Sequence, residues 1–341
     1  MAASAIGVVC GLIGTMFHFG VHEVTAFRGT HPWVLYLLPL AGFVIVSFYK
    51  LTETDGLGTD DIIDAVHEGK RLPILLLPAI FFGTVLTHLC GGSAGREGAA
   101  LQMGGTIGQC MGRTFRLDDR DLRVATLAGM AAFFSALFGT PLAATVFAIM
   151  VISIGVIYHV ALYPSLLAAL VAYGVSVRLG VEPTRFTVAV PDQSVGMFVR
   201  VAALGVLCAL VSILFCKLMH GAGHLMKRIK NPWLRVICGG FAVIALTWVF
   251  GTDYNGAGMD IVTAAVEQGI VTVPWAFLLK LLFTAITLAA GFKGGEVVPS
   301  FFVGATFGCA VAPLLGLPAG FGAAVGLAAV FCGVTNCPLA S

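Results

Sequence analysis

Two glycine-rich breaks in otherwise apolar sequence have the residue types of an anion-binding site. The first, at 91–98, reads Gly-Gly-Ser-Ala-Gly-Arg-Glu-Gly, and the second, at 291–299, reads Gly-Phe-Lys-Gly-Gly-Glu-Val-Val-Pro. Each precedes a run typical of a helix, and Pro299 suits a first helical turn. Glycines let the backbone approach an ion closely, and free N–H groups at a helix N-terminus attract negative charge. The breaks therefore predict anion binding by backbone amides, without a full positive charge that would hold a transported ion too tightly.

The composition places these breaks in a membrane. Hydrophobic residues make up 58% of the 341 residues and charged residues 11%, whereas soluble domains carry about 25% charged residues. Apolar runs of roughly membrane-spanning length recur, for example at 33–49, 74–90, 199–216, 236–250 and 275–290. We therefore expect a multi-pass integral protein of a plasma or bacterial inner membrane, surrounded by lipid.

Other partner classes lack support in the sequence. The net charge is +2, and the charges lie in the connections rather than on a basic face, so no nucleic acid is expected. The nine cysteines have no CxxC or Cys/His spacing of a metal site. We expect neither a metal nor a cofactor.

The chain also repeats itself at a spacing of 200 residues. Gly-Leu-Gly-Thr-Asp at 56–60 is matched by Gly-Ala-Gly-Met-Asp at 256–260, and glycines of the two breaks match in register. Each of these turns ends on an acid, Asp60 or Asp260, which we expect to cap a helix. Transporters built from inverted repeats bind their ligand near the midplane, between broken helices.

Loop charge predicts that the two halves have opposite orientations. Lys and Arg are retained on the cytoplasmic side of short loops. Segment 24–31 carries one such residue and its counterpart, 217–235, carries five; segment 51–72 is basic and its counterpart, 251–273, carries none. The N-terminus is therefore expected in the cytoplasm. We expect a first transmembrane repeat at 1–180, a linker at 181–195, and a second repeat at 196–341.

The breaks and the repeat resemble those of a known family. Gly-Arg-Glu-Gly-Ala at 95–99 resembles the GREGP or GKEGP signature of the CLC family of chloride channels and proton-coupled anion transporters. Residues 295–299 stand where the family has GxFxP, and 56–60 where it has GSGIP. The resemblance covers nearly the whole chain. It implies an all-α membrane protein of inverted-repeat CLC-type architecture with broken, re-entrant helices, truncated at the C-terminal end because the second repeat is incomplete. It also implies a homodimer when full length.

The function implied by the resemblance is transmembrane transport of a small inorganic anion, chloride first, with or without coupling to protons. Glu97 takes the part of the external gating glutamate: deprotonated it fills the anion site, and protonated it swings away. Mainly backbone N–H groups would bind the anion, at Leu57, Gly58, Thr59, Arg96, Glu97, Gly98, Val297 and Val298. Supporting roles are expected for Gly95, Gly295, Glu296, Pro299 and Lys280. Lys280, inside an apolar span, is expected to reach an interface or to pair with Glu296 or another buried acid.

Departures from the family pattern keep alternatives open. Leu57 stands where the family has its central anion-binding serine, and Met150 and Val151 where proton-coupled members have an internal glutamate. The pattern Gly-Gly-Glu-Val-x-Pro at 294–299 and the absence of a serine at position 57 resemble the fluoride-exporting branch. A fluoride/proton antiporter and a passive chloride channel are therefore alternatives within the family.

One alternative belongs to another class. Residues 91–95 fit Gly-x-Ser-x-Gly, so Ser93 could serve an intramembrane serine protease with His159 as its base. The repeat argues against this reading, because Lys293 stands at the matched place. A glycine-rich re-entrant turn already accounts for the motif, so we do not expect an enzyme.

Overall fold

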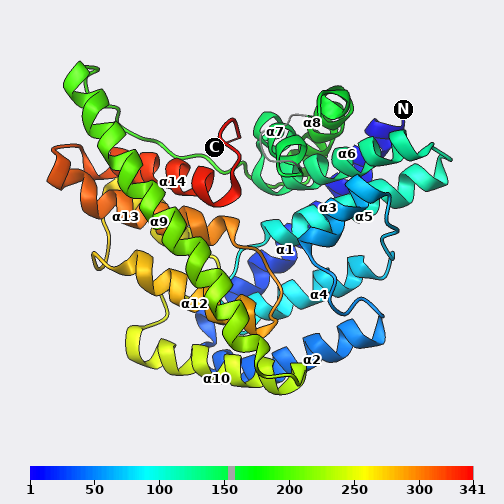
Figure 1. Cartoon of the computed structure of the whole chain (residues 1–341), viewed down its shortest axis with the longest axis horizontal. Coiled ribbons are helices and arrows are strands. Elements are labelled where there is room, and N and C mark those ends of the chain that lie inside the picture. Colours follow the sequence, from blue (N-terminus) through cyan, green and yellow to red (C-terminus); the bar gives the residue numbers. More distant parts are fainter. Residues whose placement is uncertain (153–157, 341) are drawn as a thin grey trace.

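The computed structural model describes residues 1–152 and 158–340 (Figure 1). Within these residues the secondary-structure elements are all helices. Ser341, the last residue of the predicted second repeat, lies outside the described residues. The first half contains α1 (Ala2–Thr30), α2 (Leu38–Leu51), α3 (Thr59–Glu68), α4 (Leu76–Leu89), α5 (Glu97–Thr114), α6 (Asp119–Phe138), α7 (Pro141–Met150) and α8 (Leu162–Arg178). The second half contains α9 (Val195–Lys227), α10 (Pro232–Phe250), α11 (Met259–Thr263), α12 (Ala276–Ala290), α13 (Val297–Val311) and α14 (Ala319–Thr335). Shorter turns of helix are Pro32–Leu37, His159–Ala161 and Ala312–Leu315, with a π-helical turn at Ala264–Gln268.

The helices recur at the spacing of the sequence repeat. The helices α3, α4, α5 and α6 begin 200 residues before α11, α12, α13 and α14, respectively. The breaks that precede α5 and α13 open with Gly91 and Gly291, whose φ angles of 81° and 111° lie in the region that favours glycine. Figure 1 shows the equivalent helices α2 and α10 side by side, and the two pack against each other.

Equivalent residues of the two halves also exchange equivalent hydrogen bonds. Gly95 N–H donates to the Gly295 carbonyl at 2.8 Å, and Gly295 N–H donates back to the Gly95 carbonyl at 2.9 Å. Ser93 N–H donates to Thr287 Oγ1 at 3.1 Å, and the equivalent pair is Lys293 N–H to Thr87 Oγ1 at 3.2 Å. Gly95 and Gly295 form an antiparallel bridge. Such reciprocal contacts require a local two-fold relation, so the two turns run in opposite directions, as in inverted repeats.

Close helix contacts hold each half together. In the first half α6 packs against α1, α5 and α8, and in the second α14 packs against α13 and α9. A Cβ atom at Gly104 of α5 would lie 2.8 Å from the Cβ of Phe133, and one at Gly304 of α13 would lie 2.9 Å from the Cα of Leu327. Small residues that let helix backbones approach are typical of membrane helix packing.

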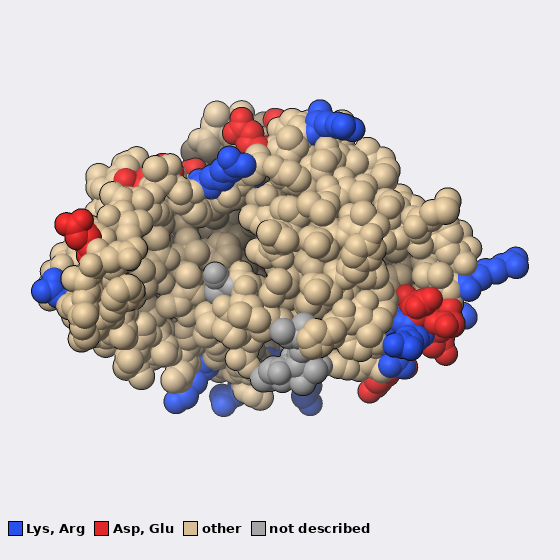
Figure 2. Space-filling model, turned by 90° about the horizontal axis from the view of Figure 1, so that it is seen from above, with Lys and Arg blue, Asp and Glu red and all other residues tan. Residues whose placement is uncertain are grey.

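Seven helical stretches in the described residues are long and apolar enough to cross a membrane: Ala2–Thr30, Pro32–Leu51, Asp119–Phe138, His159–Arg178, Val195–Lys227, Pro232–Phe250 and Val297–Leu315. Shorter apolar helices are α4, α7, α12 and α14. Figure 2 shows charged side chains near the rim of one face, around a broad uncharged middle. These features fit the predicted multi-pass membrane protein. The helix α3 is polar and is not among the candidate spans.

Candidate anion-binding site

Two helix N-termini meet at the bridge between the halves. The helix α5 begins at Glu97 and α13 begins at Val297, each directly after the bridging turn. Their N-cap residues, Arg96 and Glu296, make no side-chain capping bond, so the side chains leave the first amides of both helices uncapped. Because both helix dipoles point their positive ends at the junction, a negative charge is stabilised there.

The side chain of Glu97 occupies this junction. It is completely buried, and its Oε1 accepts a hydrogen bond of 3.0 Å from the backbone N–H of Val298 in the opposite half. The amides of Arg96 and Val297 also lie close to the carboxylate. Its other oxygen, Oε2, has no hydrogen-bond partner among the described residues. A buried carboxylate thus lies where the sequence predicts a bound anion, against a donor that the sequence assigned to the anion.

Glycine at the bridge makes room for this carboxylate. A Cβ atom at Gly95 would overlap both carboxylate oxygens of Glu97. A Cβ atom at Gly295 would lie 2.6 Å from Glu97 Oε1 and 2.5 Å from the backbone nitrogen of Gly98. These contacts are too short for a side chain. Both predicted supporting glycines are therefore needed so that the Glu97 carboxylate can approach the backbone closely, and not only for the turn itself.

Two cavities approach the junction. The first, which we name the Arg28 cavity, has a volume of about 500 Å³ and is lined by Arg28, Arg96, His18 and Val298 among others. The second, which we name the Tyr49 cavity, has a volume of about 210 Å³. It is lined by Tyr49, Leu57, Gly58, Ile80, Thr84, Ala99, Gln102, Leu288, Phe292, Lys293 and Gly294. Glu97 lines neither, but Val298, which binds its carboxylate, borders the first cavity. Ala99, two residues along α5, borders the second.

Arg96 points away from the neighbouring carboxylate. Its Nη1 lies 3.0 Å from Nδ1 of His18, its Nη2 donates to the Leu137 carbonyl at 3.5 Å, and its guanidinium lies over the ring of Phe138. Among the described residues no ion pair links Arg96 to Glu97; Lys70 and Asp61 form the ion pair found there. Among the described residues the hydrogen bond to the Glu97 carboxylate therefore comes from the backbone, and the positive charge of Arg96 faces the Arg28 cavity.

The turn before α3 lines part of the Tyr49 cavity. Two of its predicted anion-binding amides are already hydrogen-bonded to nearby protein oxygens. Leu57 N–H donates to the Thr54 carbonyl at 3.2 Å, and Gly58 N–H donates to Asp61 Oδ2 at 2.9 Å. The hydroxyl of Thr59 accepts a bond of 3.1 Å from the Gln102 side chain of α5. In this conformation Leu57 and Gly58 therefore offer no free N–H to an anion. The capping carboxylate belongs to Asp61, in the first turn of α3, and not to Asp60 as the sequence suggested.

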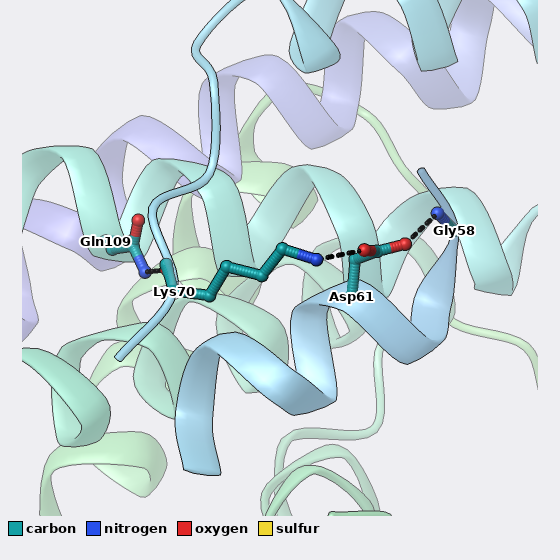
Figure 3. Close-up of polar contacts among 4 residues, drawn as sticks. All are labelled: Gly58, Asp61, Lys70 and Gln109. Carbon is teal, nitrogen blue, oxygen red and sulfur yellow. Dashed lines mark hydrogen bonds and ion pairs between the residues drawn. The ribbon is translucent and has the colours of Figure 1, made fainter. Parts of the chain in front are cut away.

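Figure 3 shows how this cap is held. Lys70 Nζ donates to Asp61 Oδ1 at 2.7 Å, and the Gln109 side chain of α5 donates to the Lys70 carbonyl at 2.8 Å. Partial burial by itself raises the pKa of Asp61, but the hydrogen bonds from Lys70 and Gly58 outweigh it. The net result is a pKa below the ordinary value of 3.8. Asp61 is thus an anionic ligand of the Gly58 amide at neutral pH.

Lys280 forms no salt bridge among the described residues, although the buried carboxylate of Glu97 is near enough to act on its charge. Its side chain is completely buried, and its Nζ donates to the carbonyls of Gly256 at 2.6 Å and Tyr254 at 3.2 Å. It neither reaches an interface nor pairs with Glu296, whose side chain is exposed. The ammonium also lies over the ring of Phe302 on α13. Lys280 therefore ties the turn before α11 to the helices that frame the site.

Ser93 has no general base in this arrangement. Its hydroxyl lies 3.0 Å from the hydroxyl of Thr284 and is completely buried. No histidine is among its hydrogen-bond partners in the described part of the chain. The Gly-x-Ser-x-Gly pattern therefore serves the re-entrant turn.

Sequence reasoning missed four residues around the Tyr49 cavity: Tyr49, Asp61, Thr84 and Lys293. An acid three residues after a possible N-cap is a signature of a capping box, and that signal could have identified Asp61. For the others no local signal exists, because they come to line one cavity only through the packing of α2, α4 and the turn before α13.

The chain matches known proteins along nearly its whole length. A family model described as Voltage gated chloride channel matches residues 40–341. The Chloride/fluoride channel protein of Pseudomonas syringae pv. tomato is 38% identical, over 99% of this chain and 77% of that protein. An H(+)/Cl(-) exchange transporter of Cronobacter sakazakii is 26% identical, over 99% of this chain and 79% of that protein.

Solved structures show the same likeness. The crystal structure of a CLC-type fluoride/proton antiporter matches with a TM-score of 0.94 and 34% identity, covering 99% of this chain and 88% of that one. A slow cyanobacterial Cl⁻/H⁺ antiporter, 20% identical, shares the fold with a TM-score of 0.79, covering 98% of this chain and 83% of that one. These matches confirm the family and the fold class predicted from the sequence. This chain belongs to the CLC family of voltage gated chloride channels and related anion transporters.

Proposed function

We propose that this protein exchanges a small halide for protons through the junction of α5 and α13, with Glu97 as the gate. The observation that carries the proposal is the 3.0 Å hydrogen bond from Val298 N–H to the buried carboxylate of Glu97. The carboxylate accepts a hydrogen bond from a backbone N–H at two paired helix N-termini. A dehydrated halide requires a binding site of the same kind. The carboxylate and the halide then compete for one place.

Competition of this kind couples protons to anions. A deprotonated Glu97 keeps its charge-assisted bond to Val298 and excludes the halide. Protonation removes that charge, so the side chain can leave the junction and the halide can take its place. The Arg28 cavity, with a volume of about 500 Å³, offers room for a displaced side chain. A halide can then enter from one cavity only after a proton has been taken up.

Fluoride is the halide that the relatives favour. The proteins that are 38% and 34% identical are named a chloride/fluoride channel protein and a fluoride/proton antiporter. The Leu57 side chain at the Tyr49 cavity also lacks the hydroxyl of the chloride-transporting pattern. Chloride, the first expectation from the sequence, is the second candidate. It is supported by the exchange transporter that is 26% identical over nearly the whole chain.

We further propose that the N-terminus lies in the cytoplasm and that two copies of the chain associate. The asymmetry of Lys and Arg between matched loops supports the orientation. In this proposed orientation the Arg28 cavity faces the outside of the cell and the Tyr49 cavity faces the cytoplasm. The family resemblance supports the homodimer. We expect no hydrolytic activity, because the hydroxyl of Ser93 bonds to Thr284 instead of a base.

Proteoliposomes test the proposal. Vesicles containing the purified protein are loaded with sodium fluoride or sodium chloride, and an outward halide gradient is imposed. A pH-sensitive dye should then report uphill proton uptake. Glu97→Gln should abolish proton uptake while halide still leaves, and Glu182→Gln, an exposed residue of the linker, should behave like the wild type.

Two outcomes would count against the proposal. Halide efflux from wild-type vesicles without proton uptake would indicate a passive channel. The absence of halide flux in wild-type vesicles would overturn the transport assignment altogether.

A further inference from the structure

The Tyr49 cavity contains two buried hydroxyl groups without partners. Tyr49 is 2% exposed and Thr84 is completely buried, yet neither Tyr49 Oη nor Thr84 Oγ1 has a hydrogen-bond partner among the described residues. Burying a hydroxyl without a partner costs free energy, so such groups are normally satisfied. Both side chains line the same cavity. A ligand that accepts hydrogen bonds would satisfy them together.

Comparison of the two repeats shows how this cavity arises. Thr84 is equivalent to Thr284, whose hydroxyl lies 3.0 Å from that of Ser93. The residue equivalent to Ser93 is Lys293, so the two-fold relation places position 293 beside Thr84. Lys293 does not pair with Thr84; its Nζ lies 4.0 Å from the ring centroid of Tyr49. Because a lysine stands where the other half has a serine, Thr84 lacks the partner that Thr284 has, and a positive charge lies over the ring of Tyr49 in the same cavity.

The lining of the cavity selects an anion. Lys293 supplies a cation, and Tyr49 and Thr84 supply two hydroxyl donors, whereas the described residues that line the cavity include no Asp or Glu. Asp61, which binds the Gly58 amide at the edge of the cavity, is itself neutralised by Lys70. A volume of about 210 Å³ holds a small anion with a few waters. Asp55 acts on Lys293 from outside the lining, so the donors face the cavity without a carboxylate among the residues that line it. Such an arrangement suits a partly dehydrated anion.

The cavity lies next to the proposed transport path. Ala99 and Gly294 line it, and both belong to the segments that surround Glu97 and the bridge. We propose that Tyr49, Thr84 and Lys293 form a second halide subsite, in which the two hydroxyls replace the one that Leu57 lacks. This inference rests on the proposed halide transport. A halide released from the Val298 amide would pass to this subsite before leaving the protein.

Halide titration of the purified protein tests the subsite. Measurements are made with sodium fluoride and sodium chloride by calorimetry in a Glu97→Gln background, where no carboxylate competes. Tyr49→Phe and Thr84→Val should each weaken halide binding about tenfold, the effect of losing one hydrogen bond to an ion. Thr84→Ser keeps the hydroxyl and should bind like the parent protein. Thr126→Val is the control, because Thr126 is a buried threonine of α6 outside the cavity whose hydroxyl bonds to the Leu122 carbonyl of its own helix.

The outcomes separate this inference from the proposed function. Unchanged halide affinity in Tyr49→Phe and Thr84→Val would show that water alone satisfies the hydroxyls and would overturn the subsite. Equal losses in Thr84→Ser and Thr84→Val would indicate packing and would overturn it as well. In either case, proton coupling that depends on Glu97 would leave the proposed function standing. If the wild-type protein does not transport halide, both the proposed function and the subsite are overturned.

Discussion

Replacement of Val298 by proline should remove one backbone donor while leaving every charged side chain in place. Proline has no N–H, so Val298→Pro deletes the group that binds Glu97 Oε1 at 3.0 Å. Val298 is the second residue of α13, where an N–H has no partner within the helix and proline is tolerated. The helix should therefore survive the substitution.

The size of the effect follows from the kind of bond that is lost. A hydrogen bond to a charged group contributes about 1.5–3 kcal/mol. At 1.36 kcal/mol for each factor of ten, the affinity for a halide that uses this donor should fall about 10- to 150-fold. The carboxylate of Glu97 loses the same donor, so the wild-type background would mask part of the change. Glu97→Gln should therefore be the background for the measurement.

Calorimetric titration with fluoride and chloride measures the effect, and Val298→Ala provides the control. Alanine removes the branched side chain but keeps the N–H, so Val298→Ala should retain halide affinity within about twofold. Equal halide affinities in Val298→Pro and Val298→Ala would refute the reasoning, because the backbone donor would then have no part in binding.

Three further predictions concern Lys280 and Asp61, which hold the turns beside the site. Lys280→Met leaves two buried carbonyls without their donor, so the free energy of unfolding should fall by about 2–4 kcal/mol. Thermal unfolding in detergent measures this loss, and Lys217→Met, at an exposed residue, should match the wild type. Asp61→Ala frees the Gly58 amide and should tighten halide binding severalfold in the same titration, whereas Asp64→Ala, exposed on the same helix, should not. Because the folded-state pKa of Asp61 is depressed, its stabilising contribution is present above its ordinary pKa of 3.8 and is lost as the pH falls through the lower folded value. The difference in unfolding midpoint between wild type and Asp61→Ala should therefore persist from pH 7 to pH 5 and shrink below pH 3.8; a constant difference down to pH 3 would contradict the role of the charge.

The breaks in the helices could be predicted from the sequence because their causes are local. Glycines at 91, 95, 291 and 295 and the proline at 299 restrict where a helix begins, and the repeat marks equivalent positions. The position of Glu97 at a helix N-terminus followed from the same pattern. These features depend on neighbouring residues, so single-sequence reasoning reaches them.

The partners of buried polar groups could not be predicted in the same way. The sequence predicts an acid or an interface for Lys280, but two carbonyls more than 20 residues earlier in the chain accept its hydrogen bonds. Asp61 rather than Asp60 binds the Gly58 amide, since the extended backbone of Gly58 decides which carboxylate reaches back. The free hydroxyl of Thr84 becomes visible only when its equivalent, Thr284, is seen paired with Ser93. Each depends on contacts between distant elements, which apolar periodicity does not encode.

Proton uptake on halide binding tests most directly whether Glu97 and the halide compete for the same donors. Calorimetry at pH 7.5 in buffers of different ionisation enthalpy gives the number of protons taken up for each halide bound. Wild-type protein should take up about one proton per halide as Glu97 leaves the Val298 amide, and Glu97→Gln should take up none. Halide binding to the wild type without proton uptake, or equal uptake by both proteins, would contradict the account.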